Sequence, residues 1–209
     1  MANVVQASGE AASVRQAERE DSTPLSRTLA RAFMDDPVAR WITRDEVRRL
    51  RTLDRAFGIG VRGVYLRDGE AWTTKQVVGG ALWMPPGAWA VPPGRQLRLL
   101  PGMVRAYGRD FPRSLRALRA VVRKHPPAPP HWYLAFIGVD PDWQGRGLGT
   151  ALLQPVLERC DRERVAAYLE ASSPQNRACY ERNGFEVTAT IELPDGGPTM
   201  WAMWRAPGG

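Results

Sequence analysis

The sequence that decides how this chain folds is Val139-Asp140-Pro141-Asp142-Trp143-Gln144-Gly145-Arg146-Gly147-Leu148-Gly149-Thr150. It follows an apolar run, residues 132–139, that predicts a buried strand, and it leads into residues 150–162, which predict a helix. Glycine at three alternate positions lets the backbone approach a ligand closely and present its amides to it. The N-terminus of the next helix adds the partial positive charge of its dipole. This arrangement predicts a cradle for a pyrophosphate group.

Two common nucleotide-binding loops do not fit this stretch. A P-loop requires a lysine and then a Ser or Thr after its last glycine, whereas here Gly149 is followed by Thr150 without the lysine. A dinucleotide fingerprint spaces its glycines as G-x-G-x-x-G, and Gly145, Gly147 and Gly149 do not have that spacing. The pattern that does fit is Gln-x-x-Gly-x-Gly, which begins at Gln144.

A second motif follows the glycine loop one strand later. Asn176 and Tyr180 stand four residues apart, and Tyr180 opens the run Tyr-Glu-Arg-Asn-Gly-Phe, residues 180–185. Taken with the loop, this block resembles the GNAT superfamily of N-acetyltransferases, in which a Gln-x-x-Gly-x-Gly loop is followed by a Tyr-Glu-x-x-Gly-Phe block. Many members of that superfamily have a longer turn before the tyrosine.

Within the superfamily the sequence is most similar to the puromycin N-acetyltransferases, which share the short spacing between the asparagine and the tyrosine. The similarity lies in residues 136–139, 169–172, 176–185, 187–189 and 203–208. It is strongest over residues 131–209. The helical stretch around Ala32 and Phe33 and the arginine-rich middle of the chain match in layout only.

The resemblance implies an α/β fold of GNAT type: a single domain with a central mixed, splayed β-sheet of about six or seven strands flanked by helices. The alternation of strands and helices after residue 131 favours the same class. We expect residues 13–209 to form this domain and residues 1–12 to be a flexible tail. Strands are predicted at 14–17, 70–74, 77–84, 132–139, 166–171, 185–193 and 199–204, and helices at 25–33, 47–66, 150–162 and 176–183, with a broken helical region at 97–122.

The composition narrows the class of protein. The chain has 209 residues, which suits one domain, and its 44% of hydrophobic residues include no run long enough to span a membrane. No charged and then apolar leader opens the chain. Cys160 and Cys179 lie in helical contexts without ligand-like spacing, so we expect two small buried side chains, no metal site and a reducing, cytoplasmic compartment.

The formal net charge of +7 raises the alternative of a nucleic-acid-associated protein. Only Lys75 and Lys124 are lysines among the 29 basic residues, and the arginines are interleaved with Asp and Glu. We therefore expect no nucleic-acid or membrane partner, although the field would favour an acidic small ligand.

The family resemblance implies transfer of an acetyl group from acetyl-CoA, as co-substrate, to a primary amine of a small molecule. Backbone amides in 145–150 would hold the pyrophosphate, and 137–139 would bind the pantetheine arm if the sheet splays there. An amide near Ile137 would polarise the thioester carbonyl. The residues expected to bind the cofactor are Ile137, Gly138, Val139, Gln144, Gly145, Arg146, Gly147, Leu148, Gly149, Thr150 and Asn176.

Tyr180 and Glu170 are the expected catalytic residues. Tyr180 would protonate the departing thiolate, and the alternative is a tyrosine that only packs in the core. Glu170, at the end of a strand beside the expected splay, would take the proton of the acceptor ammonium; an ordinary strand-end salt bridge is its alternative. Asn176 would bind the pantetheine arm or cap its short helix.

The acceptor is less well defined by the sequence. Asp35 and Asp36 would attract a cationic substrate or simply end a helix, and His125 and His131 beside the proline run 126–130 are expected to be structural. Among the eight tryptophans, we expect one or two of Trp83, Trp89, Trp132 and Trp201 to line the pocket. An aminonucleoside antibiotic such as puromycin is the leading acceptor. A CoA-binding sensor or partner-binding module without activity is the alternative, and either a monomer or a homodimer is compatible with the sequence.

Overall fold

The structure is a computed structural model that describes residues 13–208, so the predicted tail at 1–12 lies outside the described residues. The strands are β1 (Val14–Gln16), β2 (Glu70–Thr74), β3 (Gly79–Met84), β4 (His131–Val139), β5 (Ala166–Ala171), β6 (Glu186–Glu192) and β7 (Thr199–Arg205). The α-helices are α2 (Ser22–Ala32), α3 (Pro37–Ile42), α4 (Glu46–Gly60), α5 (Leu66–Asp68), α6 (Pro93–Tyr107), α7 (Phe111–Lys124), α8 (Leu148–Glu163) and α9 (Pro174–Glu181). Short turns of helix are η1 (Arg19–Asp21), the π-helical η2 (Val61–Tyr65), η3 (Gly108–Asp110) and η4 (Pro141–Trp143).

The strands form one mixed sheet of seven in the order β1-β2-β3-β4-β5-β7-β6. Only the central pair, β4 and β5, is parallel. This pairing runs from His131 opposite Ala166 to Leu134 opposite Leu169 and then stops, whereas β4 stays paired with β3 as far as Val139. The sheet therefore splays open between β4 and β5, which confirms the predicted α/β class and splayed sheet.

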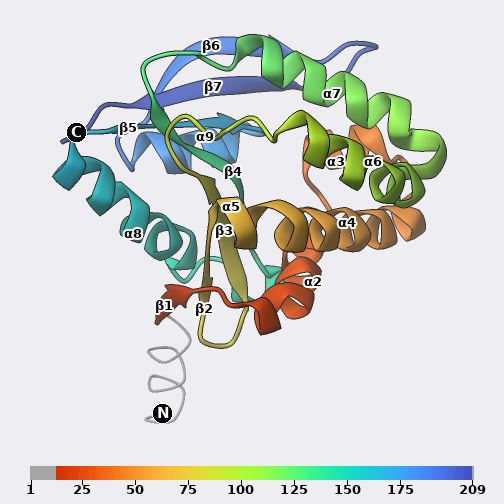
Figure 1. Cartoon of the computed structure of the whole chain (residues 1–209), viewed down its shortest axis with the longest axis horizontal. Coiled ribbons are helices and arrows are strands. Elements are labelled where there is room, and N and C mark those ends of the chain that lie inside the picture. The colour runs from red at the N-terminus through yellow and green to blue at the C-terminus, as the bar shows by residue number, and fades with distance from the viewer. Residues whose placement is uncertain (1–12, 209) are drawn as a thin grey trace.

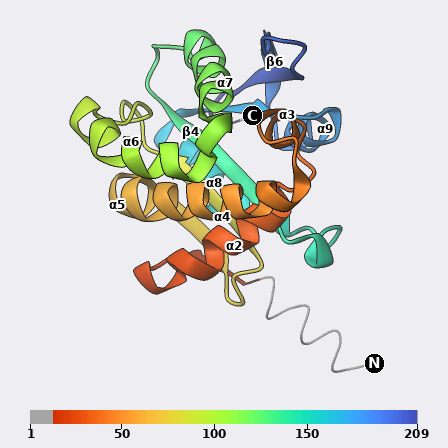
Figure 2. The same ribbon diagram turned by 90° about the vertical axis from the view of Figure 1, so that its right-hand side faces the viewer.

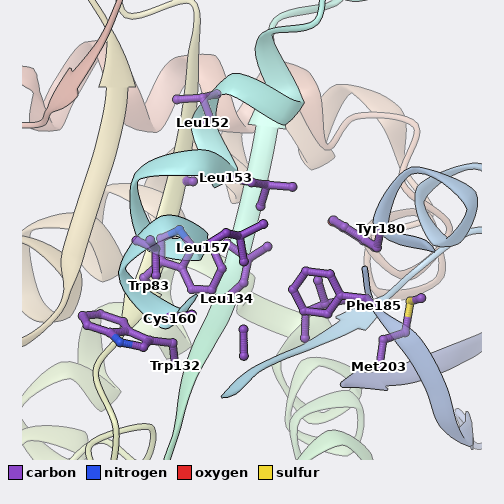
Figure 3. Packing of buried hydrophobic residues seen from close by; sticks show 14 of the residues in the cluster. Trp83, Trp132, Leu134, Leu152, Leu153, Leu157, Cys160, Tyr180, Phe185 and Met203 are labelled. Carbon is purple, nitrogen blue, oxygen red and sulfur yellow. The ribbon is translucent and has the colours of Figure 1, made fainter. Parts of the chain in front are cut away.

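Helices cover both faces of the sheet. In Figure 1, α8 lies on one side of β3 and β4, and α2 and α4 lie on the other side; the view in Figure 2 looks onto α4 with α2, α6 and α7 around it. Apolar residues of α8 pack with β4, β5 and β7 to form the core on the first face, and the ring of Tyr180 lies beside Phe185 at its margin (Figure 3). The site is thus bounded by two helical layers.

The predicted elements agree with the structure in kind, and the differences have local causes. The predicted helix 47–66 is divided into α4, η2 and α5, because the backbone takes a π-helical turn after Gly60. Asp36-Pro37 does not merely stop the first helix: the Asp36 carboxylate accepts hydrogen bonds from the amides of Val38 and Ala39 and so begins α3.

One further expectation, that both cysteines are buried, is corrected. Cys160 is buried as expected, but Cys179 is only half-buried. Both cysteines do lie on helices, α8 and α9.

Gly138 allows α2 to pack directly on β4. A Cβ atom built at Gly138 would lie 2.7 Å from the Cβ of Ala32 and 3.2 Å from the ring of Phe33. Non-bonded carbon atoms do not approach so closely without strain, so either α2 or β4 would have to move. The short distance between helix and strand is therefore a property of this glycine.

We predict that Gly138→Val lowers the free energy of unfolding by about 1–3 kcal/mol, because the added side chain overpacks the contact with α2. Urea denaturation followed by tryptophan fluorescence measures it. Gly94→Ala is the matched control: Gly94 lies in the first turn of α6, and an added Cβ meets nothing within 4 Å. Equal stability of the two variants would contradict the close approach of α2 to β4.

Candidate functional site

The glycine loop presents a row of unpaired backbone amides. Gly145 and Gly147 have positive φ angles of 74° and 78°, a conformation that glycine adopts without strain. Gly147 occupies the N-cap of α8, no side chain caps that helix, and its first turn contains no acidic residue. Within the described part of the chain, the N–H groups of residues 145–150 have no hydrogen-bond partner. Amides without partners at a helix N-terminus are suited to an anion, so the geometry is compatible with the predicted pyrophosphate cradle.

Side chains fix the loop from outside without occupying the cradle. Arg31 of α2 binds Asp140 at 2.7 Å and Asp142 at 2.9 Å, and the guanidinium keeps the pKa of Asp140 below its usual range. Gln144 donates from Nε2 to the carbonyl of Val139 at 3.0 Å, so its amide joins the loop to the end of β4. Arg146 lies over the ring of Trp143, 4.7 Å from its centroid. Gln144 and Arg146 therefore hold the loop in shape.

The opening between β4 and β5 leaves a strand edge unpaired inside the sheet. The pairing of β4 with β3 shifts by one residue between Leu82 and Trp83, so that Ala135 is an additional residue in β4. From this bulge onward, β4 no longer pairs with β5. Ile137, Gly138 and Val139 lie on this unpaired stretch, as expected for residues that would bind an amide-containing arm.

Tyr180 lies on α9, on the face of the sheet that α8 covers, and is only 8% exposed. Its ring meets Phe185 edge to face at 6.1 Å. Burial raises the pKa of the Tyr180 hydroxyl well above 10, and the neighbouring Cys179 and Asp36 add to the rise. The phenol therefore stays protonated at neutral pH, and within the described residues its hydroxyl has no hydrogen-bond partner.

Asp36 and Asn176 meet at Ser172, beside Tyr180. Ser172 donates a short hydrogen bond to Asp36, and Asn176 donates from Nδ2 to Ser172 at 3.3 Å. Asn176 does not cap α9, because that position belongs to Ser173, whose hydroxyl accepts from the amide of Asn176 at 3.1 Å. Asp36 is buried, which raises its pKa, whereas Asp35 is exposed and lies 3.9 Å from Arg40.

Glu170 lies on β5 just after its last pairing with β4, and its side chain is only 4% exposed. Its Oε2 accepts a hydrogen bond of 2.9 Å from the hydroxyl of Tyr133. Its Oε1 lies 3.7 Å from Nδ1 of His125 and has no hydrogen-bond partner. Among the described residues, Glu170 makes no salt bridge with an arginine or lysine, and its nearest basic group is His125.

Tyr133 and Tyr168 accompany Glu170 on the face of the sheet that α7 covers. Tyr180 belongs to the core on the opposite face. The two expected catalytic residues therefore lie on opposite faces of the sheet, Glu170 on β5 and Tyr180 on α9.

A cluster of aromatic rings beside Glu170 was missed by sequence reasoning. Phe33, Phe57 and Tyr65 surround Phe136, with ring centroids 5.1–6.1 Å from it, and Phe136 is 37% exposed. Tyr65 is close enough for the charge of Glu170 to raise its pKa further, after the larger effect of burial. The rings come from the turn after α2, from α4, from η2 and from β4, so no local pattern joins them.

The tryptophans take a smaller part in this region than expected. Trp83 and Trp132 belong to the core on the α8 side (Figure 3). Trp201 is half-buried beneath Arg177. Only Trp89 reaches the surroundings of Glu170, through a ring stacked on His125 at 3.9 Å.

Two general findings concern other kinds of site. Among residues 13–208, no group of three or more His, Cys, Asp or Glu side chains is placed to hold a metal ion. No helix of this part of the chain is both long and apolar enough to cross a membrane.

Comparison with known proteins supports the family resemblance suggested by the glycine loop and the block that begins at Tyr180. The model of the acetyltransferase (GNAT) family matches residues 100–185. An uncharacterised N-acetyltransferase of Schizosaccharomyces pombe is 31% identical over 196 residues, which cover 86% of this chain and 76% of that protein. The crystal structure of a Corynebacterium glutamicum protein, titled as histone acetyltransferase HPA2 and related acetyltransferase, gives a TM-score of 0.72 at 28% identity and covers 94% of this chain and 97% of that one. Arylalkylamine N-acetyltransferase 2 of Aedes aegypti shares the fold, with a TM-score of 0.57 at 13% identity over 92% of this chain and 97% of the other.

We predict that Gly147→Val raises the Kd for acetyl-CoA about tenfold. A β-branched residue at a φ of 78° costs about 1–2 kcal/mol and displaces the amides of the cradle. Isothermal titration calorimetry measures the affinity. The matched control is Gly196→Val in the turn before β7, where φ is 67° and a Cβ meets nothing within 4 Å. If both variants bind acetyl-CoA like the native protein, the loop is not the pyrophosphate site.

Proposed function

Because the chain belongs to the GNAT acetyltransferase family and transfers acetyl groups, we propose that its acceptor is the primary amine of a small molecule, which attacks the thioester of acetyl-CoA directly. The observation that carries this proposal is the splay. It places a buried, unpaired carboxylate oxygen of Glu170 and the protonated hydroxyl of Tyr180 on opposite faces of the splayed sheet.

The donor half of the site is assigned to the glycine loop and β4. The amides of residues 145–150 hold the pyrophosphate, and the unpaired edge at Ile137–Val139 binds the amides of the pantetheine arm. A backbone amide near Ile137 donates to the thioester carbonyl and stabilises the charge that develops on its oxygen. Acetyl-CoA supplies an activated acetyl group when bound.

Glu170 is the general base in this proposal. A primary amine with a pKa of about 10 arrives as an ammonium ion at neutral pH, so one proton must be removed before nitrogen can attack. Oε1 of Glu170 accepts that proton, because it is buried and accepts no hydrogen bond. Tyr133 holds the other carboxylate oxygen and so fixes the orientation of the group.

Tyr180 is the general acid. Burial keeps its hydroxyl protonated, which leaves a proton available for the sulfur of the departing CoA. A phenol with a raised pKa is a weak acid, so the transfer depends on the thiolate forming in the same desolvated environment, where its own proton affinity also rises. Asp36 and Ser172 lie next to this position and fix the start of α3 against β5.

The acceptor in this proposal is an aromatic or planar amine, with an aminonucleoside antibiotic such as puromycin as the leading candidate. The exposed ring of Phe136 and its neighbour Tyr65 provide faces for stacking beside the base. The cytoplasm is the proposed compartment.

The basic residues bear on the nucleic-acid alternative. They are less evenly spread than expected, because the segment from α6 to α7 contains nine basic residues and one acidic residue, Asp110. The basic residues are Arg95, Arg98, Arg105, Arg109, Arg113, Arg116, Arg119, Arg123 and Lys124. An electrophoretic mobility assay at low salt tests this alternative, since phosphate-driven binding weakens steeply as salt rises.

We predict that the native protein releases CoA thiol from acetyl-CoA when a panel of primary amines, puromycin included, is supplied. The thiol is followed with a disulfide reagent, and the acetylated amine is identified by mass spectrometry. Aromatic amines are expected to have the higher kcat/KM. Binding of acetyl-CoA with no release for any amine would favour the sensor alternative.

We predict that Tyr180→Phe lowers kcat about 100-fold while the Kd for acetyl-CoA changes less than twofold, because the ring and its contact with Phe185 remain. Steady-state kinetics and calorimetry measure the two quantities. Tyr107→Phe, which removes another buried hydroxyl from α6, is the control and should leave both unchanged. An unchanged kcat in Tyr180→Phe would remove this residue from the acid role.

A further inference from the structure

His125 lies next to Glu170 and His131 lies next to His125, although the sequence suggested only a structural role for both. His125 follows the last residue of α7, His131 is the first residue of β4, and the proline run 126–130 connects them. They are 6% and 3% exposed, and their Nε2 atoms are 3.0 Å apart. Glu170, His125 and His131 therefore form one buried row.

The hydrogen bond at the His131 end of the row determines which ring nitrogens carry hydrogen. Nδ1 of His131 lies 2.8 Å from the carbonyl oxygen of Pro129, which can only accept, so this nitrogen carries a hydrogen. Burial lowers the pKa of His131, so the ring is neutral and its Nε2 has a free lone pair. Nε2 of His125 must then donate the hydrogen bond between the rings.

A neutral His125 consequently turns a lone pair toward Glu170. Its Nδ1 has no hydrogen, and it faces Oε1 of Glu170 across 3.7 Å, a distance too long for a hydrogen bond. Oε1 accepts no hydrogen bond, although the hydroxyl of Tyr168, which is also buried without a partner, lies close enough to Glu170 for the carboxylate to raise its pKa. Nδ1 of His125 and Oε1 of Glu170 are then both acceptors, so no hydrogen bond joins them. One added proton between these two atoms would connect the whole row by hydrogen bonds.

We propose that His125 and His131 are positioning residues that share with Glu170 the proton taken from the acceptor amine and lead it to the surface, an inference that rests on the proposed function of Glu170 as the base. The proton joins Oε1 of Glu170 and moves to Nδ1 of His125. The hydrogen on Nε2 of His125 passes to Nε2 of His131, and the hydrogen on Nδ1 of His131 leaves to water at Pro129, which is exposed. One proton enters the row and one leaves it, each imidazole then carries its hydrogen on the other nitrogen, and tautomer exchange with water restores the starting state before the next turnover.

The titratable side chains packed against the row are tyrosines. Tyr65 of η2, Tyr133 of β4 and Tyr168 of β5 approach Glu170, and burial raises the pKa of each phenol. Trp89 stacks on His125, and Trp204 of β7 meets His131 edge to face at 5.0 Å. The rings exclude water and hold both imidazoles in place.

Nuclear magnetic resonance of the ring nitrogens tests the shared proton without any substrate. Because the chain has only two histidines, every imidazole signal reports on this row. At high pH we expect hydrogen on Nδ1 of His131 and on Nε2 of His125, and on acidification both rings should shift with one midpoint. In Glu170→Gln the midpoint of His125 should fall by at least one pH unit. A hydrogen on Nδ1 of His125 at high pH, or independent titrations unaffected by Glu170→Gln, would overturn the proposal.

Kinetics test its use in the reaction. His125→Phe keeps a flat ring against Trp89 but removes both nitrogens, so we expect kcat to fall about tenfold with KM for the amine little changed. Without His125, protonated Glu170 loses its partner, so the acidic limb of the pH profile should move to lower pH. An acidic limb that stays in place or moves to higher pH contradicts the relay.

His125→Ala with added imidazole provides a rescue that a purely structural role does not predict. We expect imidazole to restore part of kcat in His125→Ala and to have no effect on Glu170→Gln. Absence of rescue in a variant whose folding and acetyl-CoA affinity are native would count against the relay. A native protein inactive toward every amine would refute the proposed function instead, and the resonance experiment would still decide whether the proton is shared.

Discussion

The loss of pairing between β4 and β5 after Leu134 and Leu169 is the constraint on which the rest of the structure depends. Two parallel strands normally remain paired over their length, because each unpaired buried amide or carbonyl costs free energy. Here the extra residue at Ala135 bends β4 away, while its pairing with β3 continues to Val139. The glycine loop begins where that strand ends, so the same bend determines where the predicted pyrophosphate cradle stands relative to the opening.

Asp36 connects the parts of the chain that surround this opening. Its carboxylate accepts from two amides of α3 and from the hydroxyl of Ser172, and it is close enough to Tyr180 to affect its pKa. A helix cap, the end of β5 and the proposed acid thus share one buried group. Movement of α3 would consequently be felt at Tyr180, although the two are distant in sequence.

Much of the donor half could be predicted from sequence because its determinants are local. The glycine spacing, the uncapped start of α8 and the position of Tyr180 on a short helix all lie within about 45 residues, and the structure places them as expected. The acceptor side could not be predicted in the same way. Phe33, Phe57, Tyr65 and Phe136 come from four separate places in the chain, and each alone is an ordinary aromatic residue in an apolar stretch. Only the packing of α2 and α4 over β4 brings them together.

The contact between the two histidines is a second feature that could not be predicted from the sequence. Their sequence context, beside a proline run, indicates a connector, and the hydrogen bond between them depends on the tertiary fold. Glu170 was assigned from its place at the end of a strand, and the structure adds the unpaired oxygen that a sequence cannot reveal. Buried polar groups without partners are tertiary properties, because they depend on which residues fail to come close.

The splay also determines how the protein avoids unwanted strand pairing with other molecules. An open edge of a sheet can recruit a strand from a second chain and begin aggregation. The outer edges are poorly suited to this, since β1 has only three residues and β6 alternates exposed Glu186, Thr188, Thr190 and Glu192 with its inward residues. The unpaired stretch of β4 lies inside the sheet, in an opening that closes at Leu134 and Leu169, and not at an outer edge. A strand from another chain would therefore have to enter between β4 and β5 to pair with it.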